Sequence, residues 1–197
     1  MIWLWVPCVL VSGCLIDFPA PEREQDVQQL CAAGVSTCDP WAQVPGPSGG
    51  YNFSFASESG NQILKVQSRK DFYQGPGQNI TTLLKQAGPG KFQASARVRV
   101  GSNDPGIQGL ITIQMRKTGT AEWAKRSTPW TLLSPSWISV EGELDLSLPV
   151  QGINAFGELD EAWLSIETAC NPSDPGGRCD GAKTVDLFVD DAKLIKK

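Results

Sequence analysis

Hydrophobic and polar residues alternate along most of the chain after residue 50. Alternation places every second side chain on one face of a strand, so it predicts β-strands that are buried on one side. Gly, Pro, Asn and Asp separate the alternating stretches, and no window of convincing length after residue 51 has helical periodicity. The predicted strands cover residues 51–57, 62–68, 91–100, 109–117, 137–148, 162–169 and 184–194.

These strands predict an all-β fold, an antiparallel two-sheet β-sandwich of about eight strands in a jelly-roll arrangement. Residues 51–197 are enough to close a substantial core as one domain. Residues 14–50 are irregular and rich in turn-forming residues, so we expect them to be a linker or stalk.

The first residues predict export. Residues 1–13 form an apolar run that is too short to span a bilayer and is typical of a secretory signal peptide. The run ends in "VSGC", which resembles the lipobox of bacterial lipoproteins and makes Cys14 the expected lipidation site. We therefore expect a cell-surface lipoprotein or a secreted protein. No Lys or Arg precedes Arg23, so a misassigned start codon stays an alternative.

Charge and residue usage exclude several functions. The 197 residues include 17 Lys and Arg against 21 Asp and Glu, a net charge of −4, without a basic cluster that would neutralise a phosphate backbone. Nucleic acid is therefore not an expected partner. The chain has no histidine, which removes imidazole bases, Ser-His and Cys-His pairs and His-ligated metals.

The cysteines favour an oxidising compartment. Apart from Cys8 and Cys14, they form two local pairs with six and eight intervening residues, unlike the CxxC spacing of zinc or redox sites. We expect disulfide-closed loops, although a connectivity across the two pairs stays open. The four residues are Cys31, Cys38, Cys170 and Cys179.

Aromatic residues on polar faces are the candidate binding groups. In "SRKDFYQGPGQNIT", Phe72 and Tyr73 are neighbours before a predicted Gly-Pro-Gly turn, so an extended chain points one ring inward and the other outward. In "EAWLSIE", Trp163 and Glu167 share a strand face opposite the aliphatic residues. Trp123 lies among charged residues near a predicted hairpin, Trp137 is expected in the core, and Trp130 is undecided.

This combination suits carbohydrate. A flat ring stacks on the apolar C–H face of a sugar, while carboxylates, amides or guanidinium groups hydrogen-bond the hydroxyls at its rim. The sequence therefore predicts weak binding of a polysaccharide chain, at roughly millimolar to 10 µM affinity.

Six segments also resemble a known family. In order they are "VQSRKDFYQGPGQNITTLL", "GPGKFQASARVRV", "ITIQMRKTG", "SWISVEGELDLSLP", "AWLSIE" and "VDLFVDDAKL". Together they resemble carbohydrate-binding modules of the family 4/9/22 type, which have a galactose-binding-like jelly-roll fold. In that family an "R…W-x-G-P" segment precedes a "PGKxYxxSxWV" strand, and the domain closes on "FYVDDV". The resemblance covers residues 50 to 197 approximately.

The resemblance implies a set of site residues. The implied carbohydrate-binding residues are Arg69, Tyr73, Trp123, Trp163 and Glu167. It also implies a structural calcium ion, with Asp190 or Asp191 among its ligands, and no catalytic cofactor. The family's opening "NGxFExG" strand, which helps to hold that calcium, is not visible here.

The predicted function is non-catalytic binding of a β-linked polysaccharide, of the xylan or β-glucan class, through aromatic stacking and polar side chains in a concave cleft. The protein is expected to be a monomer that touches membrane only through a lipid anchor. A protein-interaction or structural module is the alternative. A glycoside hydrolase is less favoured, because jelly-roll hydrolases use a pattern like E-x-D-x-x-E. Glu158 and Asp160 begin that pattern, but Trp163 occupies its third position.

Overall fold

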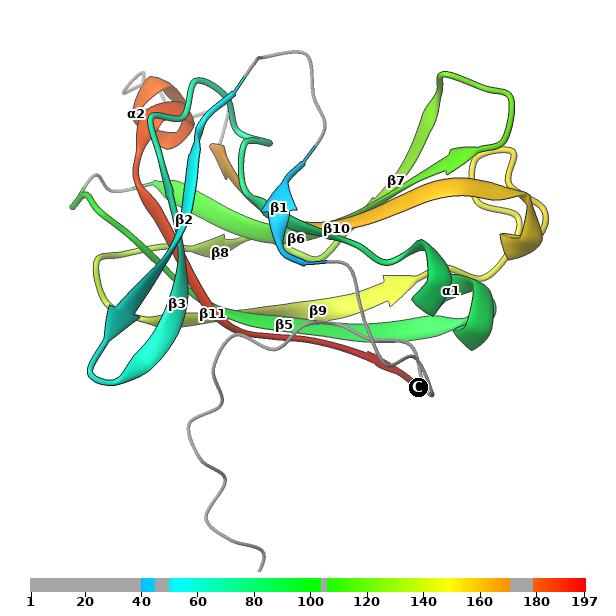
Figure 1. Cartoon of the computed structure of the whole chain (residues 1–197), viewed down its shortest axis with the longest axis horizontal. Helices are drawn as coiled ribbons and strands as arrows, with labels where there is room; N and C mark the ends of the chain where they lie inside the picture. The colour runs from blue at the N-terminus through cyan, green and yellow to red at the C-terminus, as the bar shows by residue number, and fades with distance from the viewer. Residues whose placement is uncertain (1–39, 45–49, 104–105, 171–178) are drawn as a thin grey trace, which may run out of the picture.

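The chain forms two antiparallel β-sheets packed face to face (Figure 1). The computed structural model describes residues 40–44, 50–103, 106–170 and 179–197. Sheet A has the strand order β1-β4-β10-β6-β7, with β8 also paired to β6, and sheet B has the order β2-β3-β11-β5-β9. This architecture confirms the predicted two-sheet sandwich.

The elements of sheet A are β1 (Ala42–Gln43), β4 (Pro76–Asn79), β6 (Ile107–Lys117), β7 (Trp123–Ser127), β8 (Thr131–Leu132) and β10 (Leu159–Cys170). Those of sheet B are β2 (Asn52–Glu58), β3 (Asn61–Gln67), β5 (Lys91–Val100), β9 (Ile138–Asp145) and β11 (Leu187–Lys196). Two short helices, α1 (Thr81–Ala87) and α2 (Cys179–Thr184), and a 3-10 turn, η1 (Phe156–Glu158), complete the described chain.

The seven predicted strand segments correspond to β2, β3, β5, β6, β9, β10 and β11. In β5 every second residue, from Phe92 to Val100, is buried between the sheets, as the alternation predicts. Strand β6 differs, because most of its residues are buried on both faces. Polar side chains of β6 are therefore buried on the side of sheet A that faces away from the core.

The core begins earlier in the chain than predicted. Trp41 is buried within it, and β1 pairs with β4 through Ala42 opposite Gly77. Residues 40–44 therefore belong to the folded domain, and the predicted boundary at residue 51 is too late. Five intervening residues, 45–49, lie outside the described part, as do residues 1–39, which include Cys14, Cys31 and Cys38.

The predicted Gly-Pro-Gly turn is instead part of an internal strand. Pro76 and Gly77 belong to β4, which lies between β1 and β10. A Cβ atom on Gly75 would lie 1.7 Å from the backbone oxygen of Ile166, and one on Gly77 would lie 2.3 Å from Val44 Cγ2. Glycine is needed at both positions because neighbouring chains approach the backbone closely.

The helices were also not predicted. Helix α1 is seven residues long and contributes a single fully buried side chain, Leu84, so its sequence has no periodic apolar stripe to detect. Its first turn is anchored to β10, because the backbone N–H of Ile80 donates to the carbonyl of Ala162 at 2.8 Å. Among the described residues, neither helix is long and apolar enough to cross a bilayer.

Candidate functional site

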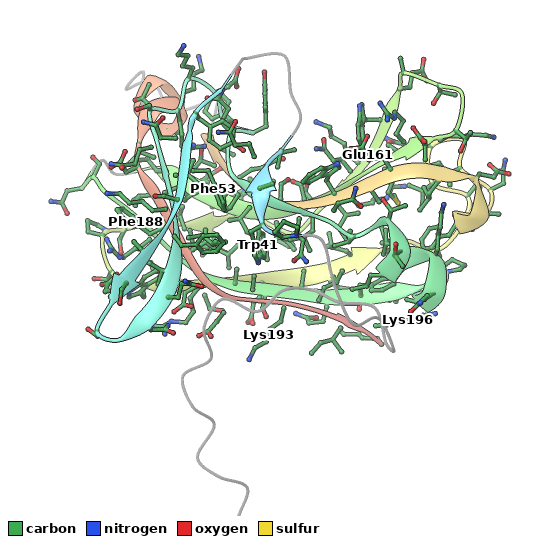
Figure 2. All side chains as sticks on the ribbon, viewed as in Figure 1. Trp41, Phe53, Glu161, Phe188, Lys193 and Lys196 are labelled. Atoms are coloured by element: carbon green, nitrogen blue, oxygen red, sulfur yellow. The ribbon has the colours of Figure 1, made fainter. Side chains whose placement is uncertain are left out.

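The outer face of sheet A, the side away from the core, carries the candidate site. Opposite residues of antiparallel strands point to the same side, so the register of β10, β6 and β7 defines this face. Figure 2 shows Glu161 on this outer side, whereas Lys193 projects from the opposite side of the molecule, beneath sheet B. The face comprises Glu161, Trp163, Ser165 and Glu167 of β10, Leu110, Thr112, Gln114 and Arg116 of β6, and Trp123, Lys125 and Ser127 of β7.

Trp163 occupies the centre of this face and is half-buried. It lies opposite Asn79 of β4 and Gln114 of β6. Its indole N–H donates to Glu161 Oε1 at 2.5 Å, which fixes the edge of the ring. Gly77 lies beside the ring, where a Cβ atom would be 3.4 Å from Trp163 Cε3. The backbone of β4 therefore packs against the indole.

Glu167 ends a hydrogen-bonded row across three strands. Its carboxylate accepts from Ser165 Oγ at 2.7 Å and from Thr112 Oγ1 at 3.2 Å, and Thr112 in turn contacts Ser127 Oγ at 2.9 Å. Burial raises the pKa of Glu167, while the hydrogen bond from Ser165 and the charge of Lys125 act in the opposite direction. Within this row Ser165 and Thr112 are buried and hold the carboxylate, whereas Glu167 and Ser127 are accessible and can hydrogen-bond a ligand.

The side chains at the centre of this face are buried, although they lie outside the hydrophobic core. Ser165 and Thr112 retain 0% and 1% of their accessible surface, and Gln114 is also buried. The outer face of an antiparallel sheet is usually solvated, so buried polar groups there mark the face as a candidate site. The concave shape expected for this face stays a prediction.

Trp123 reaches the same face one row further along. It is opposite Arg116, which is opposite Glu161. The Arg116 guanidinium lies 5.1 Å from the centre of the Trp123 ring and forms ion pairs with Asp160 at 2.8 Å and Glu161 at 2.7 Å. One face of Trp123 is thus engaged within the protein.

Trp130 is the aromatic residue that sequence reasoning left undecided. It lies in the connection between β7 and β8, both of which pair with β6, and its relative exposure is 58%. Next to it, the exposed Leu132 lies opposite Gln108 on the outer side of sheet A. We call Trp130 and Leu132 the rim of the face. The rim borders Leu110, which is the β6 partner of Glu167. An exposed tryptophan at the edge of a polar face is a candidate stacking ring.

Tyr73 lies at the Glu167 end of β10. Its loop is joined to β10 by the N–H of Thr168, which donates to the carbonyl of Phe72 at 3.1 Å. Phe72 packs against the core, as predicted for the inward member of the pair, and Tyr73 is half-buried. The structure therefore brings Tyr73 to the border of the face, and its contact with a ligand stays a prediction.

Arg69 is not a surface ligand, which corrects the sequence prediction. Only 2% of its surface is accessible. Its guanidinium donates to Thr168 Oγ1 at 2.6 Å and to the backbone carbonyls of Asp71, Phe72, Gln74, Ala182 and Val185. Burial lowers the pKa of Arg69 to about 10. Arg69 therefore holds the Tyr73 loop against β10 and α2 and presents no atom to a glycan.

Asp190 lies in a separate pocket on sheet B. A β-bulge interrupts β11 between Asp190 and Lys193. Asp190 is buried, with Oδ2 accepting from Asn61 Nδ2 at 2.8 Å and lying 3.9 Å from Arg97 Nη1. The cavity measures about 240 Å³ and is lined by Glu58, Ser59, Asn61, Ile63, Arg97, Trp137 and Asp190. Trp137 is half-buried here against Arg97 and Arg99, so its prediction as a core residue is wrong.

The pocket fits a calcium ion in part. Asn61 Oδ1 is buried without a hydrogen-bond donor, and an amide oxygen beside a carboxylate is a suitable calcium ligand pair. The described residues contain no cluster of three or more His, Cys, Asp or Glu side chains that could hold a metal. Asp190 and Asn61 would therefore need other oxygen ligands. Asp191 is less suited, because its carboxylate lies 3.6 Å from Arg97 and is partly exposed.

The two carboxylates that begin the hydrolase pattern, Glu158 and Asp160, form ion pairs with basic side chains. Glu158 forms an ion pair with Lys117 at 2.9 Å, which lowers its pKa, and Asp160 pairs with Arg116. A glycosidase acid needs a raised pKa to protonate the leaving oxygen. Glu158 has the opposite shift.

No family model and no curated protein matches the chain. Among solved structures, the CBM22-2 xylan-binding domain of Xyn10C from Paenibacillus barcinonensis superposes with a TM-score of 0.59 at 18% identity, covering 80% of this chain and 91% of that one. The fold is that of a carbohydrate-binding module.

Two further carbohydrate-binding modules agree with this assignment. The C-terminal family 22 module of Xyn10B from Clostridium thermocellum has a TM-score of 0.55 at 11% identity, over 83% of this chain and 89% of that one. The family 11 module of Lic26A-Cel5E from the same organism has a TM-score of 0.50 at 12% identity, over 88% and 96%. At such identities the similarity shows the fold alone.

Proposed function

We propose that the chain binds a β-linked polysaccharide, of the xylan or β-glucan class, on the outer face of sheet A without cleaving it. The observation that carries the proposal is Trp163 and Glu167 on one face of β10, with the hydroxyl row beside them. The ring offers a stacking surface, and Glu167 and Ser127, the accessible members of the row, offer hydrogen bonds. The modules with the same fold include ones described as xylan-binding, which supports the ligand class.

The test is binding of the purified protein to xylan, mixed-linkage β-glucan and mannan, measured by affinity electrophoresis and calorimetry. Trp163→Ala removes stacking area and should weaken binding by about 1–3 kcal/mol, or about ten- to a hundredfold. The melting temperature should change little, because Trp163 is half-buried and outside the core cluster.

Trp137→Ala is the matched control, because it removes an indole from the other sheet. It should leave glycan affinity unchanged, while Trp130→Ala should weaken binding as Trp163→Ala does. Unfolding of the Trp163→Ala protein with residual glycan binding would instead show a packing role. If no polysaccharide binds the wild-type protein, the alternative of a protein-interaction or structural module is favoured.

We also propose that the protein is exported, as a lipoprotein acylated at Cys14 or in secreted form, and that Cys170 and Cys179 form a disulfide. Cys170 ends β10 and Cys179 begins α2, but their side chains and residues 171–178 lie outside the described part of the structure. Peptide mapping of the native protein under non-reducing conditions should recover the two cysteines in one cross-linked fragment. Free thiols at both positions would contradict this.

A further inference from the structure

The outer face of sheet A carries an ammonium group that the binding site described so far does not use. Trp163, Gln114 and Lys125 lie side by side on β10, β6 and β7. Neighbouring strands are about 4.8 Å apart, so Lys125 stands roughly 10 Å across the sheet from Trp163. A sugar chain stacked on Trp163 and running across the strands therefore passes Lys125 on its way to the sheet edge.

Lys125 is held at this position through its backbone. Its N–H donates to Gln151 Oε1 at 2.9 Å, which satisfies the outward-facing donor of the edge strand. The side chain is exposed, and within the described residues its Nζ atom forms neither a hydrogen bond nor an ion pair. Lys125 shares its face of the sheet with Glu167, and its charge favours the ionised form of that carboxylate.

The second basic side chain of this face differs in its surroundings. Arg116 is bound to both Asp160 and Glu161 and covers Trp123, so its charge is already neutralised within the protein. Glu161 shares this guanidinium with Asp160, so the three groups together keep one negative charge, and both oxygens of Glu167 accept hydrogen bonds from hydroxyl groups. Lys125 is thus the cation on the described face that is available to an anionic ligand.

We propose that Lys125 makes the site selective for glycans that bear uronic acid residues, with the carboxylate of the sugar bound by its ammonium group. This inference rests on the proposed function of the same face. A uronate differs from the neutral sugar by one carboxylate in place of a hydroxymethyl group, so stacking on Trp163 is retained while Lys125 gains a charged partner. An ion pair at an exposed lysine is modest in strength, and a gain of about two- to fivefold in affinity is expected.

The experiment compares one polysaccharide in two forms, a glucuronic-acid-substituted xylan and the same xylan after chemical reduction of its carboxyl groups. The wild-type protein should bind the acidic form about two- to fivefold more tightly, and high salt should remove the difference because it screens the pair. Lys125→Gln should abolish the preference by weakening only the acidic ligand. Lys125→Arg should restore it.

Lys193→Gln is the matched control, because it removes the same charge from the outer side of sheet B (Figure 2). It should keep the preference. Equal affinity of the wild type for the two forms, or a preference that survives Lys125→Gln, would overturn the inference while leaving polysaccharide binding intact. A role of Lys125 in neutralising Glu167 alone would weaken both ligands equally, which also overturns it. Failure of the proposed function is distinguishable, because neither form would then bind or Trp163→Ala would change nothing.

Discussion

At the scale of single residues, the buried carboxylate of Glu167 is unfavourable for folding, and the proposed function gives it a role in binding. Its carboxylate lies among hydroxyl groups on a crowded face, without an ion pair among the described residues. Burial disfavours its charged form and raises its pKa. A residue retained at a cost to stability is typical of a functional site. Arg69 shows the opposite case, a buried charge whose many carbonyl partners fix a loop.

Glu167→Gln tests this interpretation through pH. Because the folded-state pKa of Glu167 is raised above its unfolded value, the folded state binds the proton more tightly, and its stability falls as pH rises through the window between the two values. The glutamine variant should lack this part of the decline and be more stable than wild type above the window, yet bind glycan more weakly. Urea unfolding across a pH series measures the first effect. Lower stability of the variant at every pH would contradict it.

At the scale of elements, β4 connects the two ends of the site. It carries Asn79 beside Trp163 at one end and follows the Tyr73 loop at the other. The strand packs between β1 and β10 only because glycines at 75 and 77 let the chains approach. The position of Tyr73 relative to Trp163 is therefore set by the backbone contact of β4 with β10.

Gly75→Ala should consequently destabilise the protein by about 3 kcal/mol or more, because the new Cβ would overlap a backbone oxygen of β10 that cannot move without breaking the sheet. Gly157→Ala is the control, since a Cβ there meets nothing within 4 Å, and its effect should stay within about 0.5 kcal/mol. Thermal or urea denaturation compares the two. Similar stability of both variants would show that the β4–β10 contact is looser than described.

At the scale of the whole molecule, the Asp190 pocket connects strands of sheet B through side-chain contacts. Asp190 comes from β11, Asn61 from β3 and Arg97 from β5, so this pocket joins three adjacent strands of the sheet that lies opposite the proposed binding face. Two cations can satisfy its carboxylate. One is the Arg97 guanidinium, and the other is a calcium ion that would also use the unsatisfied oxygen of Asn61.

Removal of calcium discriminates between them. If calcium binds, saturation at about 100 times its Kd stabilises the folded state by about 2.7 kcal/mol, and a chelator should lower the melting temperature by about 5–10 °C. Asp190→Asn should abolish the response, whereas Asp145→Asn, on the exposed part of β9, should keep it. An unchanged melting temperature on chelation would mean that calcium does not bind and that groups of the protein itself satisfy Asp190. Calcium should not change the glycan affinity of the folded protein.

The sequence by itself determined seven of the strands, though not β1, β4, β7 and β8, and it placed Trp163 and Glu167 on one face. Both follow from alternation within a single strand, which is local information. The resemblance of the six segments to carbohydrate-binding modules likewise predicted a fold that the superpositions confirm.

Only the tertiary structure decided which residues from other segments join that face. Register between β10, β6 and β7 is set by long-range pairing and by bulges, so no local pattern could place Lys125 beside Gln114 or Trp130 at the rim. Nor could it show that Arg69 is enclosed by carbonyls from α2 and the Tyr73 loop, or that Trp137 lies outside the core against two arginines. These outcomes depend on contacts between segments far apart in the chain, and the physical reason is that burial is a property of the assembled sheets.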